Sequence, residues 1–277
     1  MAAVEGFGIY RSTNGGASWS ASNNGLTNYF VRNFGYRSSN NSLYVGTSSG
    51  VFKTTNTGAS WVSVSTGLPS GTVSGIQAFG GSETVWVSIY GQGIYRSTDG
   101  GLTWANRSSD LPLSNGAVQV TTFTVPAGFN DPYAVVEGYG VYRGTSGGTN
   151  WIAQNNGLPA GKYGFQGGIA TPGDGYLYAA IDGQGIYRGT TGAVTSSNLT
   201  WTLWTNSASL PKFRLRAPSL VNGTYYVATG QGVYTSADNG ATWTAFKTGL
   251  PGGYIINTVT DPGNAQTVYA AGDTLYK

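Results

Sequence analysis

A segment in which a glycine-rich turn runs into a tryptophan recurs six times along the chain. Its fullest copy is S-T-D-G-G-L-T-W at residues 97–104, and successive tryptophans are 42 to 50 residues apart. A period in the forties is the length of one supersecondary unit in a repeat protein. The chain is therefore expected to fold as a series of similar units. The six tryptophans are Trp19, Trp61, Trp104, Trp151, Trp201 and Trp243.

Each repeat carries the signals of four short strands. An alternating run such as 85–90 ends in the glycine turn 91–93 and continues into 94–96, which is typical of a β-hairpin. A polar strand follows each tryptophan, and a Leu-Pro turn then leads into another β-rich run such as 117–123. No segment has a sustained apolar period of 3.6 residues, and 45 glycines and 10 prolines punctuate the chain too often for helices. The sequence predicts an all-β protein, a β-propeller of four-stranded antiparallel blades.

The two ends of the chain leave the number of blades open. The sequence has six glycine-turn segments but seven copies of the hairpin, the first at residues 2–11 and the last at 268–277. Either seven blades form, with three-stranded units at the ends, or six blades form, with a closing sheet that mixes strands from both ends. We favour seven blades. In either case residues 1–277 are expected to form a single propeller domain.

The pattern S-x-D-G-G-x-T-W resembles the Asp-box of the bacterial-neuraminidase-repeat propellers, and we call the six segments box turns. That superfamily includes sialidases, xyloglucan-degrading glycoside hydrolases, sortilin-type receptors and photosystem assembly factors. The resemblance covers nearly the whole chain and implies that the box braces a turn on the face away from the usual ligand site. Side chains that replace the aspartate can still bond turn amides, and Trp104 is expected to be buried in its blade. The box residues assigned a structural role are Asn14, Asn56, Asp99, Ser146, Thr191 and Asp238, with the six tryptophans.

Composition excludes several kinds of chemistry. The chain has no cysteine and no histidine, which removes disulfides, thiol nucleophiles, the usual zinc sites and every triad that needs imidazole. We therefore expect no metal and no cofactor. The formal charge of +3 is diffuse and no basic run exists, so we expect no nucleic-acid partner. No apolar run approaches the roughly 20 residues that span a bilayer.

The balance of residue types favours a location outside the cytosol. Charged residues make up only 9% of the chain, while Ser, Thr, Asn, Gly and Tyr dominate, which is more common in secreted and cell-surface proteins. The first five residues lack the charged start and apolar stretch of a secretory signal. We therefore expect an extracellular or cell-surface protein whose signal peptide is absent from this chain because it has been removed.

Aromatic and basic residues gather after the Leu-Pro turns, where the innermost strands of a propeller begin near the mouth of its channel. Aromatic rings stack on sugar rings while amides and guanidinium groups bond hydroxyls, so carbohydrate or a cell-surface polymer is the favoured ligand. The hairpin turns at the same face repeat Gly-Gln-Gly, which would present one amide per blade. Packing between blades and turn geometry are the structural alternatives for these residues. The candidates are Tyr29, Gln92, Lys162, Tyr163, Phe165, Gln184, Phe213, Arg214, Arg216, Gln231 and Tyr254.

Carboxylates suited to hydrolysis are scarce. The segment 213–218 faintly echoes the sialidase Phe-Arg-Ile-Pro motif, but it follows the fifth box turn instead of lying near the start. Inverting hydrolysis of the xyloglucanase kind needs two carboxyl groups about 6.5 to 9.5 Å apart. Asp174 and Asp182 are the carboxylates least explained by turn geometry, and they are the weak catalytic candidates.

The sequence therefore predicts a non-catalytic extracellular binding or structural module. Two alternatives stay open. One is a self-assembling structural protein whose chains join through their terminal strands by strand addition. The other is a glycoside hydrolase propeller, xyloglucanase-like or sialidase-like, or a fragment of one.

Overall fold

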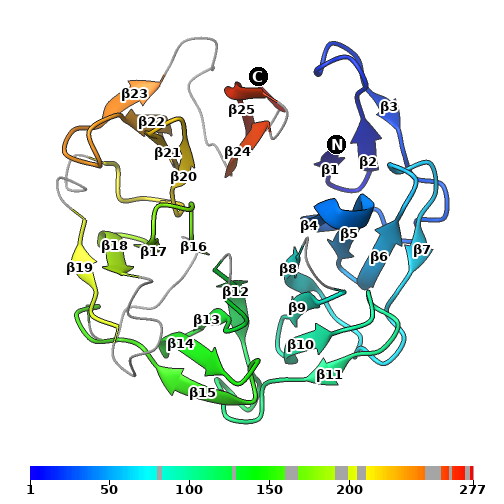
Figure 1. Ribbon diagram of the computed structural model, residues 1–277, viewed down its shortest axis with the longest axis horizontal. Helices are drawn as coiled ribbons and strands as arrows, with labels where there is room; N and C mark the ends of the chain where they lie inside the picture. The colour runs from blue at the N-terminus through cyan, green and yellow to red at the C-terminus, as the bar shows by residue number, and fades with distance from the viewer. Residues whose placement is uncertain are drawn as a thin grey trace. The chain divides into compact units, whose positions relative to one another are not determined.

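The chain is all-β in the computed structural model, which describes residues 1–79, 83–126, 129–159, 168–190, 199–204, 210–246, 257–261, 264–271 and 275–276. These residues form 26 strands and one short 3-10 helix, η1 (Ser38–Asn40) (Figure 1). The strands make seven antiparallel sheets, each built from strands that are consecutive in sequence. The predicted propeller of antiparallel blades is confirmed. No helix in the described part of the chain is long and apolar enough to cross a membrane.

Residues 1–122 and 148–150 form a first compact unit. Its first sheet has three strands, β1 (Ala2–Val4), β2 (Gly8–Arg11) and β3 (Ser20–Ala21). The second sheet contains β4 (Val31–Arg37), β5 (Ser42–Thr47), β6 (Gly50–Thr54) and β7 (Val62–Ser63). The third contains β8 (Val73–Ala78), β9 (Val85–Ile89), β10 (Gly93–Ser97) and β11 (Ala105–Asn106).

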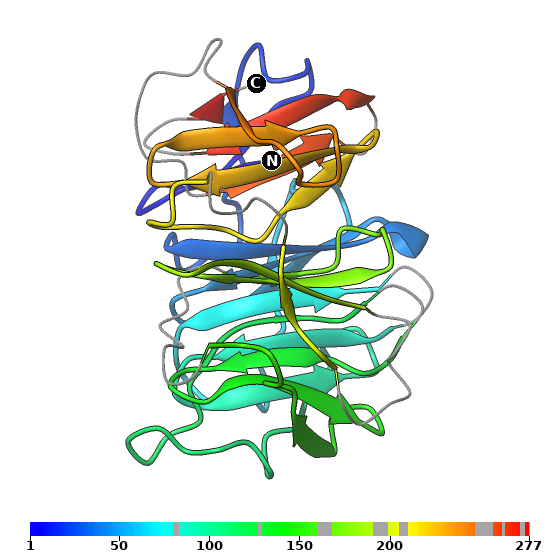
Figure 2. The same ribbon diagram turned by 90° about the vertical axis from the view of Figure 1, so that its left-hand side faces the viewer.

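Residues 123–147 and 151–277 form a second compact unit. One of its sheets contains β16 (Ile169–Ala170), β17 (Tyr176–Ile181), β18 (Gly185–Thr190) and β19 (Thr202–Leu203). The next sheet contains β20 (Ser219–Val221), β21 (Thr224–Thr229), β22 (Gly232–Ser236) and β23 (Thr244–Phe246). The strands of the β20–β23 sheet run side by side in Figure 2. A further sheet contains β12 (Val120–Thr124), β13 (Tyr133–Val136), β14 (Gly140–Thr145) and β15 (Asn150–Ala153). The last sheet contains β24 (Asn257–Asp261), β25 (Asn264–Ala271) and β26 (Leu275–Tyr276). Strands β12 and β15 include residues of both units.

Five of the described sheets have four strands, and the first and last have three. The first sheet corresponds to the last three strands of a full sheet, because β1 and β2 form the hairpin and β3 follows the box turn. The last sheet corresponds to the first three strands of a full one, since β25 and β26 form its hairpin. This pairing is the one expected for the favoured arrangement with three-stranded units at the ends.

Antiparallel pairing sends alternate connections to opposite ends of each sheet. The hairpin turn between the second and third strands and the connection to the next sheet lie at one end, which we call the turn end. The box turns, between the third and fourth strands, lie at the other end, which we call the box end.

Apolar residues of neighbouring sheets pack together to form the core. In the first unit, Val85, Val87 and Ile89 of β9 are fully buried with Tyr44 and Val73 of the adjoining strands. Alternate residues of the strands point to opposite faces, so both faces of an inner sheet are apolar where a sheet lies on each side. Burial of these side chains fixes the strands, and the polar and aromatic groups described next are carried on their connections.

Candidate functional site

The ligand residues predicted from sequence do not all lie in one part of the structure. Lys162, Tyr163, Phe165 and Tyr254 lie outside the described residues. Tyr29 and Gln92 belong to the first unit, and Gln184, Phe213, Arg214, Arg216 and Gln231 belong to the second. The second unit therefore carries the larger described set, which centres on the loop 212–216.

The loop 212–216 is fastened over two hairpin turns of the second unit. The Gly183 N–H donates to the Lys212 carbonyl at 2.6 Å, and the Gly230 N–H donates to the Phe213 carbonyl at 2.9 Å. Next in the loop, the Leu215 N–H donates to Asp182 Oδ1 at 3.4 Å, while the Leu215 side chain is buried in the core. The loop is thus held by its backbone on the turn end of both sheets, with Lys212 and Phe213 exposed and Arg214 and Arg216 half-buried.

Phe213 presents an aromatic ring on this loop. Its side chain is 60% exposed. The ring lies so close to Gly230 that a Cβ there would come within 2.7 Å of ring atom Cδ1, so only glycine permits this seat. The Arg214 guanidinium lies 5.2 Å from the ring centre, and Arg214 has a φ of 52°, a left-handed conformation that is unusual for a long side chain. Backbone strain of this kind is found where a site positions a side chain.

Polar residues lie in the loop and in the two hairpin turns beneath it. Lys212 and Gln231 are exposed, and Gln184 is half-buried. The Asp182 carboxylate is used by the loop itself, whereas Lys212 and Arg214 add positive charge. The backbone N–H of Arg216 donates to the Ala228 carbonyl at 3.0 Å, so Arg216 belongs to the strand that follows the loop. The arrangement suits a ligand with an apolar face and hydrogen-bonding or weakly acidic groups at its rim.

The three Gly-Gln-Gly segments are not equivalent. Gln92 and Gln184 close three-residue turns, in which their N–H groups donate to the carbonyls of Ile89 at 2.9 Å and Ile181 at 3.0 Å. Gln231 lies in a two-residue turn between Thr229 and Gly232, where the Thr229 hydroxyl donates to the Gly232 carbonyl at 2.9 Å. The turns differ by one residue, so they do not present a repeated amide in the same position.

Tyr29 and the next residue, Phe30, are both exposed aromatic side chains of the first unit. Asn28 orders this connection, because its Oδ1 accepts from the Phe30 N–H at 2.9 Å and from the Ser48 hydroxyl at 3.1 Å. Two other exposed aromatics at the turn end of this unit were not among the sequence candidates. They are Phe7 and Tyr90, which lie at the third and first positions of three-residue hairpin turns. The x-G-x-G turn pattern could have indicated both.

The catalytic candidates Asp174 and Asp182 lie at opposite ends of β17. Six strand residues separate them, which corresponds to roughly 20 Å or more at about 3.3 Å per residue. Asp174 Oδ2 accepts from the hydroxyls of Tyr178 and Tyr225, each at 2.6 Å. Asp182 accepts from the loop 212–216 instead. These two carboxylates therefore do not form the closely spaced pair that inverting hydrolysis requires.

The tyrosines around Asp174 keep their protons. Burial raises the pKa of Tyr178 above its usual value, and the hydrogen bond to Asp174 raises it further. Burial and the same carboxylate also raise the pKa of Tyr225. Tyr225 comes from the neighbouring sheet of the second unit, so Asp174 links two sheets at the box end. This contact has the character of a structural cross-link.

Four of the six box turns share one hydrogen-bonding pattern. Asp99 Oδ1 accepts from the Ser97 hydroxyl at 2.7 Å and from the Thr103 N–H at 2.9 Å, and Asp99 Oδ2 accepts from the Thr103 hydroxyl at 2.5 Å. The Thr103 bonds, with a smaller contribution from Ser97, lower the pKa of Asp99 to about 2. Asp238 repeats this pattern with the same pKa, and Asn14 and Asn56 accept corresponding bonds through their amide oxygens. Ser146 has a left-handed backbone, and Thr191 lies outside the described residues.

Three of the box-turn tryptophans link neighbouring sheets through their indole N–H groups. The indole N–H groups of Trp61, Trp104 and Trp201 donate to the carbonyls of Ser22, Val64 and Gln154 at 2.7 to 2.8 Å. Trp61, Trp151 and Trp201 are buried, Trp243 is half-buried and Trp19 is exposed. The expectation of a buried Trp104 is wrong, because this side chain is half-buried.

Comparison with solved structures shows the fold alone. YCF48 from Cyanidioschyzon merolae superposes with a TM-score of 0.73 at 14% identity, over 98% of this chain and 88% of that chain. A structure described as YCF48 bound to D1 peptide gives 0.64 at 15% identity, over 90% and 78%. An ancestral GH74 enzyme gives 0.70 at 19% identity, over 97% of this chain but only 41% of the enzyme. No protein-family model matches the chain, and no curated protein sequence matches it either. The chain is therefore similar in fold to propellers of both binding proteins and glycoside hydrolases.

Proposed function

We propose that the protein is a non-catalytic binding module whose ligand surface is the turn end of the second unit, centred on Phe213. The observation that carries this proposal is the exposed Phe213 ring, which Gly230 and three loop hydrogen bonds hold in place. An aromatic ring that is already ordered loses little conformational freedom when a ligand stacks on it. Such a ring with amide and cationic neighbours favours a carbohydrate or cell-surface polymer, and we place the protein outside the cell or at its surface.

A glycan array and titration with the glycans that bind would test the site. We expect Phe213→Ala to weaken binding about tenfold or more, since about 1.4 kcal/mol of lost stacking corresponds to a factor of ten. Phe246→Ala is the matched control, because Phe246 is also an exposed aromatic of this unit but lies on the outer strand β23. Equal glycan binding by the two folded variants would place the ligand surface elsewhere.

A polar peptide is the second candidate ligand. It is favoured by the similar fold of YCF48, for which a structure with D1 peptide is described, and by the cationic Lys212 and Arg214 beside the ring. A peptide array separates the two ligand classes. If peptides bind and glycans do not, and if Arg214→Ala weakens binding as strongly as Phe213→Ala, the peptide candidate replaces the carbohydrate one. Hydrolysis of xyloglucan or of sialosides would contradict both, and would favour a glycoside hydrolase.

A further inference from the structure

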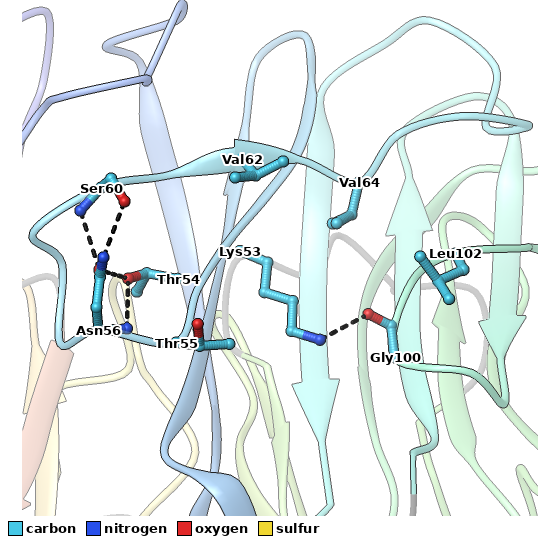
Figure 3. A pocket seen from close by; sticks show the side chains of 9 residues that line it. All are labelled: Lys53, Thr54, Thr55, Asn56, Ser60, Val62, Val64, Gly100 and Leu102. Atoms are coloured by element: carbon cyan, nitrogen blue, oxygen red, sulfur yellow. Dashed lines mark hydrogen bonds between the residues drawn. The ribbon is translucent and has the colours of Figure 1, made fainter.

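A small hollow opens at the box end of the first unit, between the β4–β7 and β8–β11 sheets (Figure 3). Its volume is about 240 Å³. The box turn of residues 54–60 forms one side, and Gly100 and Leu102 of the next box turn form the other. Apolar cavities of roughly 150 Å³ can already take up a benzene ring, so this hollow has room for one aromatic group.

The mouth of the hollow is apolar, and one cation reaches into it. Val62 is 66% exposed and Leu102 is 73% exposed, although both are apolar side chains. The ammonium group of Lys53 extends toward Gly100, as Figure 3 shows, and donates to its carbonyl at 3.3 Å. Lys53 also lies 5.3 Å from the ring centre of Tyr44. A ligand that covers the valine and leucine would therefore meet a positive charge.

In the second unit, a tryptophan side chain occupies the position that corresponds to Val64. Val64 and Trp204 both follow their box tryptophan by three residues. Their backbone N–H groups make the same bond, Val64 to the Val51 carbonyl at 2.9 Å and Trp204 to the Ile186 carbonyl at 2.8 Å. Val51 and Ile186 each follow the glycine that begins the third strand of their sheet. Val64 and Trp204 are therefore structural equivalents.

Trp204 shows what the space beyond Val64 accepts. Its indole is 1% exposed and stacks edge-on against Tyr178 with ring centres 4.7 Å apart. The indole N–H donates to the Asn239 carbonyl at 3.0 Å. In the first unit the equivalents of Tyr178 and Asn239 are Tyr44 and Gly100, and Gly100 lines the hollow. Groups equivalent to those that receive the indole in the second unit are thus present in the first, where no described side chain supplies the ring.

We propose that this hollow is a second binding site, which takes an aromatic side chain followed by an acidic residue in a peptide of a partner protein. The ring occupies the place that Trp204 fills in the second unit, and the carboxylate pairs with Lys53. Lys53 is the cation of the hollow, and the Glu83 carboxylate, which pairs with Arg37, also lies beside Gly100, so a ligand carboxylate would share Lys53 with it. This site is at the box end of the first unit, so it is independent of the proposed ligand surface around Phe213.

Capped dipeptides with the full chain test the proposal by NMR of the Val64 and Leu102 methyl groups. We expect N-acetyl-Trp-Asp-amide to bind with a Kd on the order of 1 mM, as befits a ligand of this size. N-acetyl-Trp-Lys-amide should bind at least tenfold more weakly because its charge opposes Lys53. N-acetyl-Ala-Asp-amide should not shift the methyl signals, because it lacks the ring.

Two variants separate the ring from the charge. Val64→Trp copies the side chain of the equivalent repeat and should abolish Trp-Asp binding in a folded protein. Lys53→Gln should weaken Trp-Asp binding about tenfold and make the Trp-Asp and Trp-Lys affinities equal, and it provides the test should Val64→Trp fail to fold. Phe213→Ala is the control and should leave the affinity unchanged. The proposal is overturned if folded Val64→Trp binds as the parent does, or if Lys53→Gln leaves the preference for Trp-Asp intact.

Discussion

Two junctions between neighbouring sheets have similar backbone hydrogen bonds but differ in the side chain that lies between the sheets. We call them the Val64 junction, between the β4–β7 and β8–β11 sheets of the first unit, and the Trp204 junction, between the β16–β19 and β20–β23 sheets of the second. At the Trp204 junction, Trp204 packs edge-on against Tyr178, Tyr225 and Trp243. At the Val64 junction a valine leaves a hollow beside Lys53 and a half-buried Trp104.

The two junctions differ most at the residue three places after the box tryptophan, which is a valine in one and a tryptophan in the other. The box turns of the following sheets, at residues 97–104 and 236–243, make the same hydrogen bonds, and the tyrosine of the second strand is present in both junctions as Tyr44 and Tyr178. The Trp204 junction adds a carboxylate, Asp174, that joins two tyrosine hydroxyls. At the Val64 junction the Tyr44 hydroxyl donates to the Gly100 carbonyl at 3.2 Å. The Trp204 junction should therefore contribute more to stability.

The largest expected effect is on the indole of the Trp204 junction. Trp204→Ala removes an aromatic group that is 1% exposed, and a change of this kind typically costs about 3 to 5 kcal/mol of unfolding free energy. Val64→Ala removes less, from a half-buried site, and should cost about 1 kcal/mol. Urea denaturation of both variants measures the difference. Equal losses would remove the contrast between the junctions.

A smaller effect is expected from the carboxylate of the same junction. Asp174→Ala leaves two largely buried tyrosine hydroxyls without their acceptor, which should cost about 2 kcal/mol. Asp110→Ala is the control, since this aspartate is exposed. Denaturation midpoints measured side by side give the comparison, and an Asp174 variant as stable as the Asp110 variant would show that the cross-link contributes nothing.

Alkaline pH should weaken the Trp204 junction. The folded-state pKa values of Tyr178 and Tyr225 are raised, so their contribution to stability is complete below the unfolded value of about 10 and is lost as the pH rises above it. Thermal unfolding followed between pH 9 and 11.5 should show a fall in midpoint. Tyr225→Phe should flatten this fall, whereas Tyr29→Phe, at an exposed tyrosine, should leave its slope unchanged.

The smallest effect concerns acid and the box turns that complete both junctions. The pKa of Asp99 and of Asp238 is lowered to about 2, so their stabilising contribution is present above the unfolded value of about 3.9 and is lost as the pH falls toward 2. Asp99→Asn, which copies the box turns of Asn14 and Asn56, should reduce the acid sensitivity of unfolding. An Asp99→Asn variant that unfolds at the same acid pH as the parent protein would contradict this assignment.

The repeat, the strand content and the propeller could be predicted from sequence because they depend on local signals. Glycine turns, alternating strands and the spacing of the tryptophans each act within one unit of the repeat. The end strands were also predicted, since incomplete copies of the hairpin are visible at residues 2–11 and 268–277.

Contacts between sheets could not be predicted in the same way. Asp174 was a catalytic candidate because its partner Tyr225 lies 51 residues away and no local pattern joins them. Trp104 is half-buried whereas Trp61 and Trp201 are buried at equivalent positions, and the sequence of the box turn does not reveal this difference. Gln231 and Gln92 both lie in a Gly-Gln-Gly segment, but the turn of Gln231 is one residue shorter and is closed by the Thr229 hydroxyl. The seat of Phe213 on Gly230 likewise joins two turns that are distant in sequence.

The second glycine of the box turn lies opposite a position at which the repeats carry different side chains. A Cβ at this glycine would lie 3.1 Å from Val64 in one junction and 2.5 Å from the Trp204 indole in another, and the residue three places after the preceding tryptophan occupies the space. Serine, valine, arginine and tryptophan are all accommodated there, at Ser22, Val64, Arg107 and Trp204 opposite Gly58, Gly101, Gly148 and Gly240. A substitution at this one position would therefore change the space beside the box turn without altering the strands around it, and each of these four junctions carries such a position.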